Sequence, residues 1–157
     1  MILYHGTNTD FQQIRLDMSR VGKDFGFGFY LTTDKQVATR QAERKLLQYG
    51  TGAKVVQSYF LDESKLQDLK VLRFETYTEE WADFILLNRQ NKEHHSVHNY
   101  DIVIGPIAND RVGVQLWRYE TQSIDLQTLV RNLQYMKGVT IQYYFGTERA
   151  IKLLRRL

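Results

Sequence analysis

The chain contains 157 residues, of which 43% are hydrophobic and 25% are charged, and its formal net charge is +3. These values are typical of one folded domain over residues 1–157, and they exclude a disordered chain. There is no cysteine, which excludes disulfides, thiol catalysis and cysteine-bound metals, and the mild charge gives no argument for nucleic-acid binding.

The sequence also bears on cellular location. Residues 1–5 have neither the basic start nor the long apolar run of a secretory signal. No apolar run approaches the roughly 20 residues that cross a bilayer. Together with the absence of cysteine, this pattern predicts a cytoplasmic protein that binds no membrane.

The first predicted element is an apolar strand, Ile2–His5, which runs into Gly6 and Thr7. A histidine at the end of a strand can hold a hydroxyl group, while the backbone of the following glycine donates and accepts hydrogen bonds. The polar stretch Asn8–Lys23 is predicted to be a loop with a short helical turn. It is interpreted either as a mobile lid over a pocket or as an ordinary surface connection.

The next stretch, Asp24–Thr33, combines glycines with aromatic residues. Gly26 and Gly28 lack side chains, so the backbone can bend sharply or approach a ligand closely. Four aromatic side chains lie beside this bend: Phe25, Phe27, Phe29 and Tyr30. The pattern suits a flat aromatic ligand, but taken alone it is more typical of a core strand with a glycine bulge.

The remaining chain predicts helices and strands from hydrophobic spacing and capping residues. Strands are predicted at Lys54–Leu61, Val71–Phe74, Tyr100–Asp110 (running into a tight turn) and Thr140–Phe145. Helices are predicted at Lys35–Tyr49 (capped by Thr33 or Asp34), Glu63–Leu69, Thr78–Arg89, Asp125–Lys137, and from the Thr147 cap through Leu157. The apolar run Ile102–Ile104 is typical of a central strand buried on both faces.

Two polar clusters allow a functional interpretation. Arg40, Arg44 and Lys45 form a basic set on the first long helix. They are predicted to be a solvated face, with the alternative that one of them, taken as Arg40, reaches a pyrophosphate. Three histidines lie close together in the later stretch Asn91–Asn99: His94, His95 and His98. No carboxylate or cysteine pattern accompanies them, so a solvated loop is favoured and no metal site is predicted.

Two of these stretches together resemble the ADP-ribosyltransferase superfamily. Its first strand carries His-Gly-Ser/Thr, as in His5-Gly6-Thr7, and its second carries a Gly-Phe/Ile-Tyr core, as in Gly28-Phe29-Tyr30. The chain is most similar to a group of small bacterial single-domain proteins, the domain of unknown function DUF3990. The shared motifs are His-Gly, Asp-Phe-Gly-x-Gly-Phe-Tyr-Leu-Thr, Asp-Ile-Val-x-Gly-Pro-x-Ala and a late Gln-x-x-Phe, and the likeness runs from Leu3 to about Leu154.

The resemblance implies an α+β fold of the ADP-ribosyltransferase type, with two small antiparallel sheets packed at a cleft and peripheral helices. It implies an NAD-dependent transferase that modifies a macromolecular acceptor, protein or nucleic acid, with NAD as substrate and no metal. Because members of the group often look like toxins, a toxin of a toxin–antitoxin or defence pair, with an antitoxin protein as partner, follows as a hypothesis.

The resemblance also assigns site residues. His5, Tyr30 and Gln142 are the expected catalytic residues: His5 holds a ribose hydroxyl, and Tyr30 stacks on the nicotinamide ring, whose carboxamide meets the Gly6 backbone. The residues expected to bind NAD are His5, Gly6, Thr7, Phe25, Gly26, Gly28, Tyr30 and Arg40.

The late strand departs from the family pattern, because many transferases of this fold carry a glutamate there. Gln142 stands in that position, or it is the upstream partner of a glutamate that Tyr144 has replaced. Glutamine cannot act as a base near pH 7, and the fallback carboxylates Glu148 and Asp110 have no positional support. A non-catalytic NAD or ADP-ribose binding module, or an NAD glycohydrolase, therefore remains an alternative.

Overall fold

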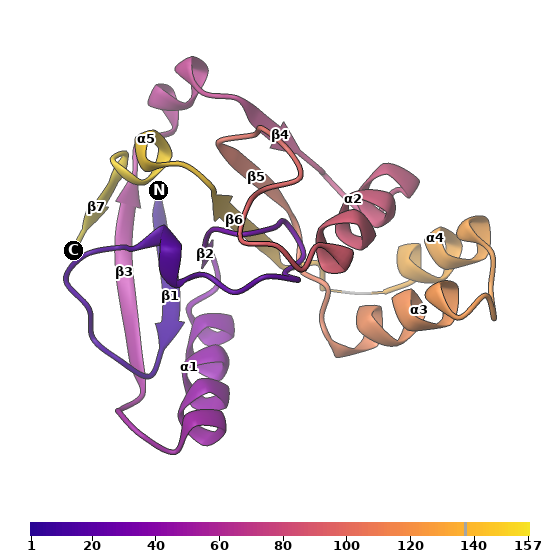
Figure 1. Cartoon of the computed structure of the whole chain (residues 1–157), viewed down its shortest axis with the longest axis horizontal. Helices are drawn as coiled ribbons and strands as arrows, with labels where there is room; N and C mark the ends of the chain where they lie inside the picture. The colour runs from indigo at the N-terminus through magenta and orange to yellow at the C-terminus, as the bar shows by residue number, and fades with distance from the viewer. Residues whose placement is uncertain (137) are drawn as a thin grey trace.

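The computed structural model describes residues 1–136 and 138–157, which form an α+β domain around one seven-stranded sheet (Figure 1). The strands are β1 (Ile2–Thr7), β2 (Phe29–Thr32), β3 (Val55–Leu61), β4 (Val71–Arg73), β5 (Ile102–Pro106), β6 (Ile141–Phe145) and β7 (Leu154–Arg156). Their order across the sheet is β4-β5-β6-β2-β1-β3-β7. The sheet therefore places the amino-terminal strand β1 in its interior, between β2 and β3.

The helices surround this sheet. They are α1 (Lys35–Tyr49), α2 (Glu79–Gln90), α3 (Asp110–Glu120), α4 (Leu126–Gln134) and the short α5 (Glu148–Ile151), with 3-10 turns η1 (Leu16–Met18) and η2 (Glu63–Asp68). Asp34, rather than Thr33, caps α1 by accepting hydrogen bonds from the backbone of its first turn, and Gly50 ends it at a φ of 65°. Among the described helices, none has the length and apolar character needed to cross a membrane.

The sheet departs from the predicted arrangement. The α+β class is confirmed, but two separate antiparallel sheets are wrong, because all strands belong to one sheet and β4 and β5 run parallel. Between β1 and β2 the register records a single pair, Tyr4 with Thr32. That one pair joins β4-β5-β6-β2 to β1-β3-β7, so the sheet is nearly divided at its centre.

Several predicted elements have different bounds. The predicted final helix through Leu157 is wrong, because α5 makes about one turn and the chain then pairs as β7 with the free edge of β3. The predicted helix Glu63–Leu69 is the 3-10 turn η2. Helix α3 was not predicted at all. The predicted helix Asp125–Lys137 is observed as α4, and its expected end at Lys137 lies outside the described residues.

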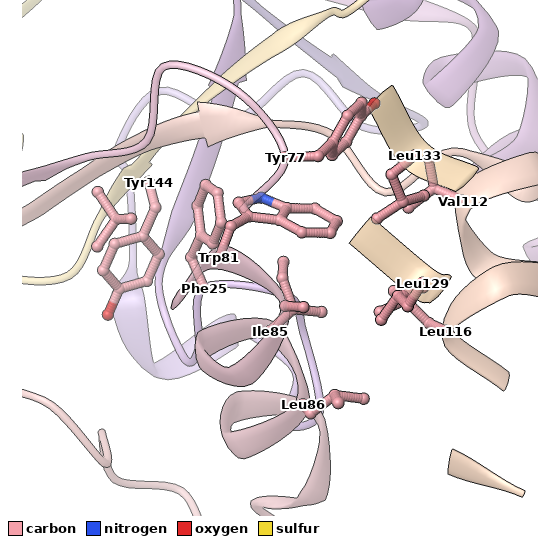
Figure 2. Packing of buried hydrophobic residues seen from close by; sticks show 12 residues of the cluster. Phe25, Tyr77, Trp81, Ile85, Leu86, Val112, Leu116, Leu129, Leu133 and Tyr144 are labelled. Carbon is pink, nitrogen blue, oxygen red and sulfur yellow. The ribbon is translucent and has the colours of Figure 1, made fainter. Parts of the chain in front are cut away.

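The two faces of the sheet are covered by separate hydrophobic clusters. Val103 and Tyr144 belong to one cluster, whereas their neighbours Ile102 and Phe145 belong to the other. Because successive strand residues point to opposite faces, β5 and β6 are buried on both sides, as predicted for a central strand. Figure 2 shows Trp81 of α2 between Phe25 and Tyr144 on one side and the leucines of α3 and α4 on the other.

A buried carboxylate ties three parts of the fold together. Asp101, which is 1% exposed and directly precedes β5, accepts hydrogen bonds from the Arg149 guanidinium, the Thr147 hydroxyl and the Lys70 backbone amide. Burial alone would raise the pKa of Asp101, but these donors outweigh it and hold its pKa below the usual range. Asp101 therefore fastens the start of α5, through the ion pair with Arg149, and the segment between η2 and β4, through the Lys70 amide, to the start of β5.

We predict that Asp101→Asn lowers the free energy of unfolding by about 2 kcal/mol, because it weakens the Arg149 contact and places an amide against a backbone donor. Urea unfolding at pH 7 measures the loss. The matched control is Asp83→Asn, which changes an exposed carboxylate on α2 and should leave stability within about 0.5 kcal/mol. Equal effects in the two variants would contradict the assigned role of Asp101.

Candidate functional site

A cavity of about 700 Å³ opens where β1 and β2 part. This volume lies within the range of small-molecule sites. Its wall includes the three predicted catalytic residues, His5, Tyr30 and Gln142, together with Gly6. These residues come from β1, β2 and β6, so the sheet order brings together side chains that are far apart in the sequence.

His5 is held in one orientation and one protonation state. Its Nδ1 donates a hydrogen bond to the Tyr30 carbonyl oxygen at 2.7 Å, and because a carbonyl can only accept, the proton of the neutral ring lies on Nδ1. Burial, followed by the positive charge of Lys45, lowers the pKa of His5 to about 3. The ring is therefore neutral at physiological pH, with Nε2 as a hydrogen-bond acceptor.

Gly6 is a glycine because α1 lies against its backbone. A Cβ atom at this position would come 1.9 Å from the carbonyl oxygen of Ala38 in α1. The Gly6 carbonyl accepts a hydrogen bond of 2.8 Å from the Lys45 ammonium, which also lies 3.5 Å from Nε2 of His5. One lysine thus contacts an acceptor of His5 and an acceptor of Gly6 on β1.

Tyr30 presents its ring rather than its hydroxyl. The hydroxyl donates to the Gly26 carbonyl at 2.7 Å and accepts from the Phe25 amide at 3.0 Å, which closes the preceding turn. Burial raises the pKa of Tyr30 well above its usual value. The ammonium of Lys23 lies 4.7 Å from the ring centroid. The hydroxyl therefore has a structural role, and the ring is a flat surface covered by a cation.

Gln142 is buried, and one of its side-chain polar atoms forms no hydrogen bond with the described residues. It pairs with Thr32 of β2 and with Gly105 of β5, and it is 9% exposed. Within the described part of the chain, its amide nitrogen has no hydrogen-bond partner. Tyr144, the alternative occupant of the glutamate position, is fully buried and donates to the Phe27 carbonyl at 3.1 Å. Of the two candidates, Gln142 is the one that lines the cavity.

The other residues expected to bind NAD do not belong to the cavity wall: Thr7, Phe25, Gly26, Gly28 and Arg40. Phe25 is fully buried in the core. A Cβ atom at Gly26 would come 2.7 Å from the Asn88 side chain, and one at Gly28 would come 2.2 Å from the Tyr144 ring. These glycines thus permit close packing of the protein on itself, while Arg40 is exposed on α1.

The cavity wall also contains the basic residues Lys23, Lys45, Arg89 and Lys92. One residue of the basic set on α1, taken as Arg40, was expected to reach a pyrophosphate, but Lys45 is the member of that set that lines the cavity. A helical signal for Lys45 was present. At 3.6 residues per turn, Lys45 falls about 20° from the buried Ala38 around α1, whereas Arg40 falls about 160° away. Periodicity therefore places Lys45 on the face that meets β1 and Arg40 on the solvent face.

The stretch with three histidines was predicted to be a solvated loop, and two of the three side chains are exposed. His94 and His95 are exposed, but Nε2 of His98 hydrogen-bonds the Phe25 carbonyl at 2.8 Å, and the His98 ring packs against Phe84 and Tyr144. Within residues 1–136 and 138–157, no group of histidine, cysteine and acidic residues is arranged to hold a metal ion. His98 therefore supports the turn behind the cavity.

The low pKa of His5 predicts acid sensitivity. Between pH 6.5 and about 3, the His5 ring is protonated in the unfolded chain but neutral in the folded chain. The stability that the neutral His5 ring contributes is therefore present above pH 6.5 and is lost as the pH falls towards 3. Lys45 and Lys23, the charged groups that lower this pKa, stay protonated throughout that range.

We predict that His5→Asn reduces the pH dependence of the unfolding free energy between pH 7 and 5, by up to about 1.4 kcal/mol per pH unit. Urea unfolding of both proteins at each pH measures the difference. His95→Asn, which changes an exposed ring, is the matched control. An unchanged slope in His5→Asn would show that His5 titrates normally in the folded protein.

The family model described as "Protein of unknown function (DUF3990)" matches residues 1–156 of the chain. The chain therefore belongs to this family. No curated protein sequence matches it.

Proposed function

We propose that this member of the DUF3990 family is an NAD-dependent ADP-ribosyltransferase acting on a macromolecular acceptor. One observation carries the proposal: His5, Tyr30 and Gln142, which the superfamily resemblance singles out from three separate motifs, line the same cavity. The proposal includes an ADP-ribosyltransferase-like fold, to which the near division of the sheet between β1 and β2 lends support.

The reaction breaks the bond between nicotinamide and ribose and leaves an oxocarbenium-like sugar. A protein assists by fixing the ribose and the departing ring in one geometry and by stabilising the developing charge. In this proposal Nε2 of His5 accepts a hydrogen bond from a ribose hydroxyl. The Gln142 side chain, which lines the cavity, hydrogen-bonds a ribose hydroxyl, and the Tyr30 ring supports the nicotinamide.

The acceptor is proposed to be nucleophilic in its own right, or to bring its own base. The acidic residues in the described cavity wall are Asp24 and Glu120. Asp24 is paired with Arg89 at 2.7 Å, and Glu120 is exposed at the end of α3. Glu148 lies outside the wall, and the side chain of Asp110 lies outside the described residues. Among these described side chains, Asp24, Glu120 and Glu148 do not replace the glutamate that other transferases carry.

A non-catalytic ADP-ribose binding module is the second candidate, and one observation favours it. The Lys23 ammonium lies over the Tyr30 ring, where it repels the positively charged nicotinamide ring of NAD unless it moves. ADP-ribose carries no such ring and meets no such repulsion. An NAD glycohydrolase differs from the transferase only in taking water as acceptor.

A toxin of a toxin–antitoxin or defence pair, neutralised in the bacterial cytoplasm by an antitoxin protein, is the biological setting that we propose. It rests on the resemblance alone. A self-contained single domain suits a toxin, because NAD and an acceptor are then its only requirements. Co-expression with the product of a neighbouring gene, followed by copurification and a growth assay, tests this setting.

We predict that Gln142→Met lowers nicotinamide release from NAD on the order of 100-fold, because it removes the amide that this proposal places on the ribose. Stability should be retained, since the amide nitrogen has no protein partner to lose. Nicotinamide release and transfer of labelled ADP-ribose to macromolecules of a bacterial extract are the measurements. Gln127→Met, at an exposed position of α4, is the control.

Full activity in Gln142→Met would contradict the role of Gln142. If the unmodified protein binds ADP-ribose through Gln142 but releases no nicotinamide, the binding module replaces the enzyme. If free ADP-ribose is the sole product, the protein is a glycohydrolase.

A further inference from the structure

Three lysines line the described cavity wall, Lys23, Lys45 and Lys92, and the first two contact the predicted catalytic residues without a carboxylate partner. Lys45 reaches in from α1, where its ammonium contacts the Gly6 carbonyl at 2.8 Å and Nε2 of His5 at 3.5 Å. Lys23 reaches in from the loop before β2 and lies over the Tyr30 ring. Among the described residues, neither ammonium forms an ion pair with an aspartate or glutamate.

The charges around the two lysines make this arrangement unfavourable. Burial, then Lys45 and Arg20, lower the pKa of Lys23 to about 8, and burial, then Arg20, lower that of Lys45 to about 8. The opposing charge of Asp24 is already engaged by Arg89 at 2.7 Å, and His5 on β1 is neutral. Like charges held together in a desolvated site cost stability unless an anion is present.

We propose that Lys23 and Lys45 form a subsite for the diphosphate group of a nucleotide ligand. The identity of that ligand, ADP-ribose or the ADP-ribose part of NAD, rests on the proposed function. An anion between the two ammonium groups supplies the negative charge that the protein lacks there. Lysine suits this task, because it binds phosphate as a point charge at the end of a flexible stem.

The same contacts explain how the subsite prepares the rest of the cavity. In the structure Lys45 occupies the Gly6 carbonyl and Nε2 of His5, and Lys23 occupies the Tyr30 ring. A diphosphate draws both ammonium groups to itself and releases these three positions together. A ribose hydroxyl can then donate a hydrogen bond to Nε2 of His5, and a flat ring can stack on the Tyr30 ring. Phosphate binding and exposure of the reaction site are therefore coupled.

The test compares Lys23→Met, Lys45→Met and the control Lys54→Met in the full chain. Met keeps the length of the apolar stem and removes the charge. Lys54 is exposed and paired with Glu43 at 3.1 Å, so its loss leaves the cavity unchanged. Calorimetric titration with ADP-ribose, inorganic pyrophosphate, NAD and nicotinamide riboside, which has no phosphate, gives the affinities. Thermal unfolding checks that each variant is folded.

We expect each cavity variant to bind ADP-ribose and pyrophosphate about tenfold more weakly, because one charge-assisted contact is lost. Lys23→Arg and Lys45→Arg should retain most of the affinity. Nicotinamide riboside should bind Lys23→Met at least as well as the unmodified protein, since the cation over Tyr30 is gone. Affinity for ADP-ribose should fall as the pH rises through about 8, because both amines lose their charge.

The outcomes separate this inference from the proposed function. Lysine-dependent binding of ADP-ribose and pyrophosphate without nicotinamide release from NAD supports the subsite and removes the enzyme. NAD turnover with affinities unchanged in both Met variants overturns the subsite and keeps the enzyme. Failure of the unmodified protein to bind either phosphate ligand also overturns the subsite.

Discussion

The hydrogen bond from the His5 imidazole to the Tyr30 carbonyl oxygen is the contact on which the site depends. It joins β1 to β2 beside the single backbone pair, Tyr4 with Thr32, that connects them. The contact keeps the strands close enough for one sheet, yet leaves between them the opening that forms the cavity. It also fixes the proton on Nδ1, so that the His5 ring presents an acceptor to whatever enters.

Local sequence patterns determined most of the helices and strands but not their assembly. Helix α1 has the predicted bounds because its cap, its periodicity and its terminal Gly50 all agree. Strand β7 could not be predicted, because Leu154–Arg156 becomes a strand only through the free edge of β3. Helix α3 contains Gly113, which disfavours a helix locally, and it is stabilised by packing on α2 and α4.

The site was predictable to the extent that it follows from motifs. His5, Tyr30 and Gln142 were named from the resemblance, and they share one cavity. The glycines beside Tyr30 allow two interpretations, because the absence of a side chain can serve close packing as well as ligand approach. Gly28 lies against the Tyr144 ring, which is a contact between distant segments. Lys23 could not be found from the sequence, because a loop has no periodicity that shows where a side chain points.

The contact of Gly6 with Ala38 has a consequence for how the cavity admits a molecule. Helix α1 rests on β1 backbone to backbone, so it has no room to slide inward and no side chain to compress. The wall behind Lys45 is therefore closely packed, and adjustment on this side falls to the rotation of the long amine side chain itself. Such rotations are among the fastest motions in proteins. The Lys45 side of this site can therefore open by side-chain rotation, without a shift of α1.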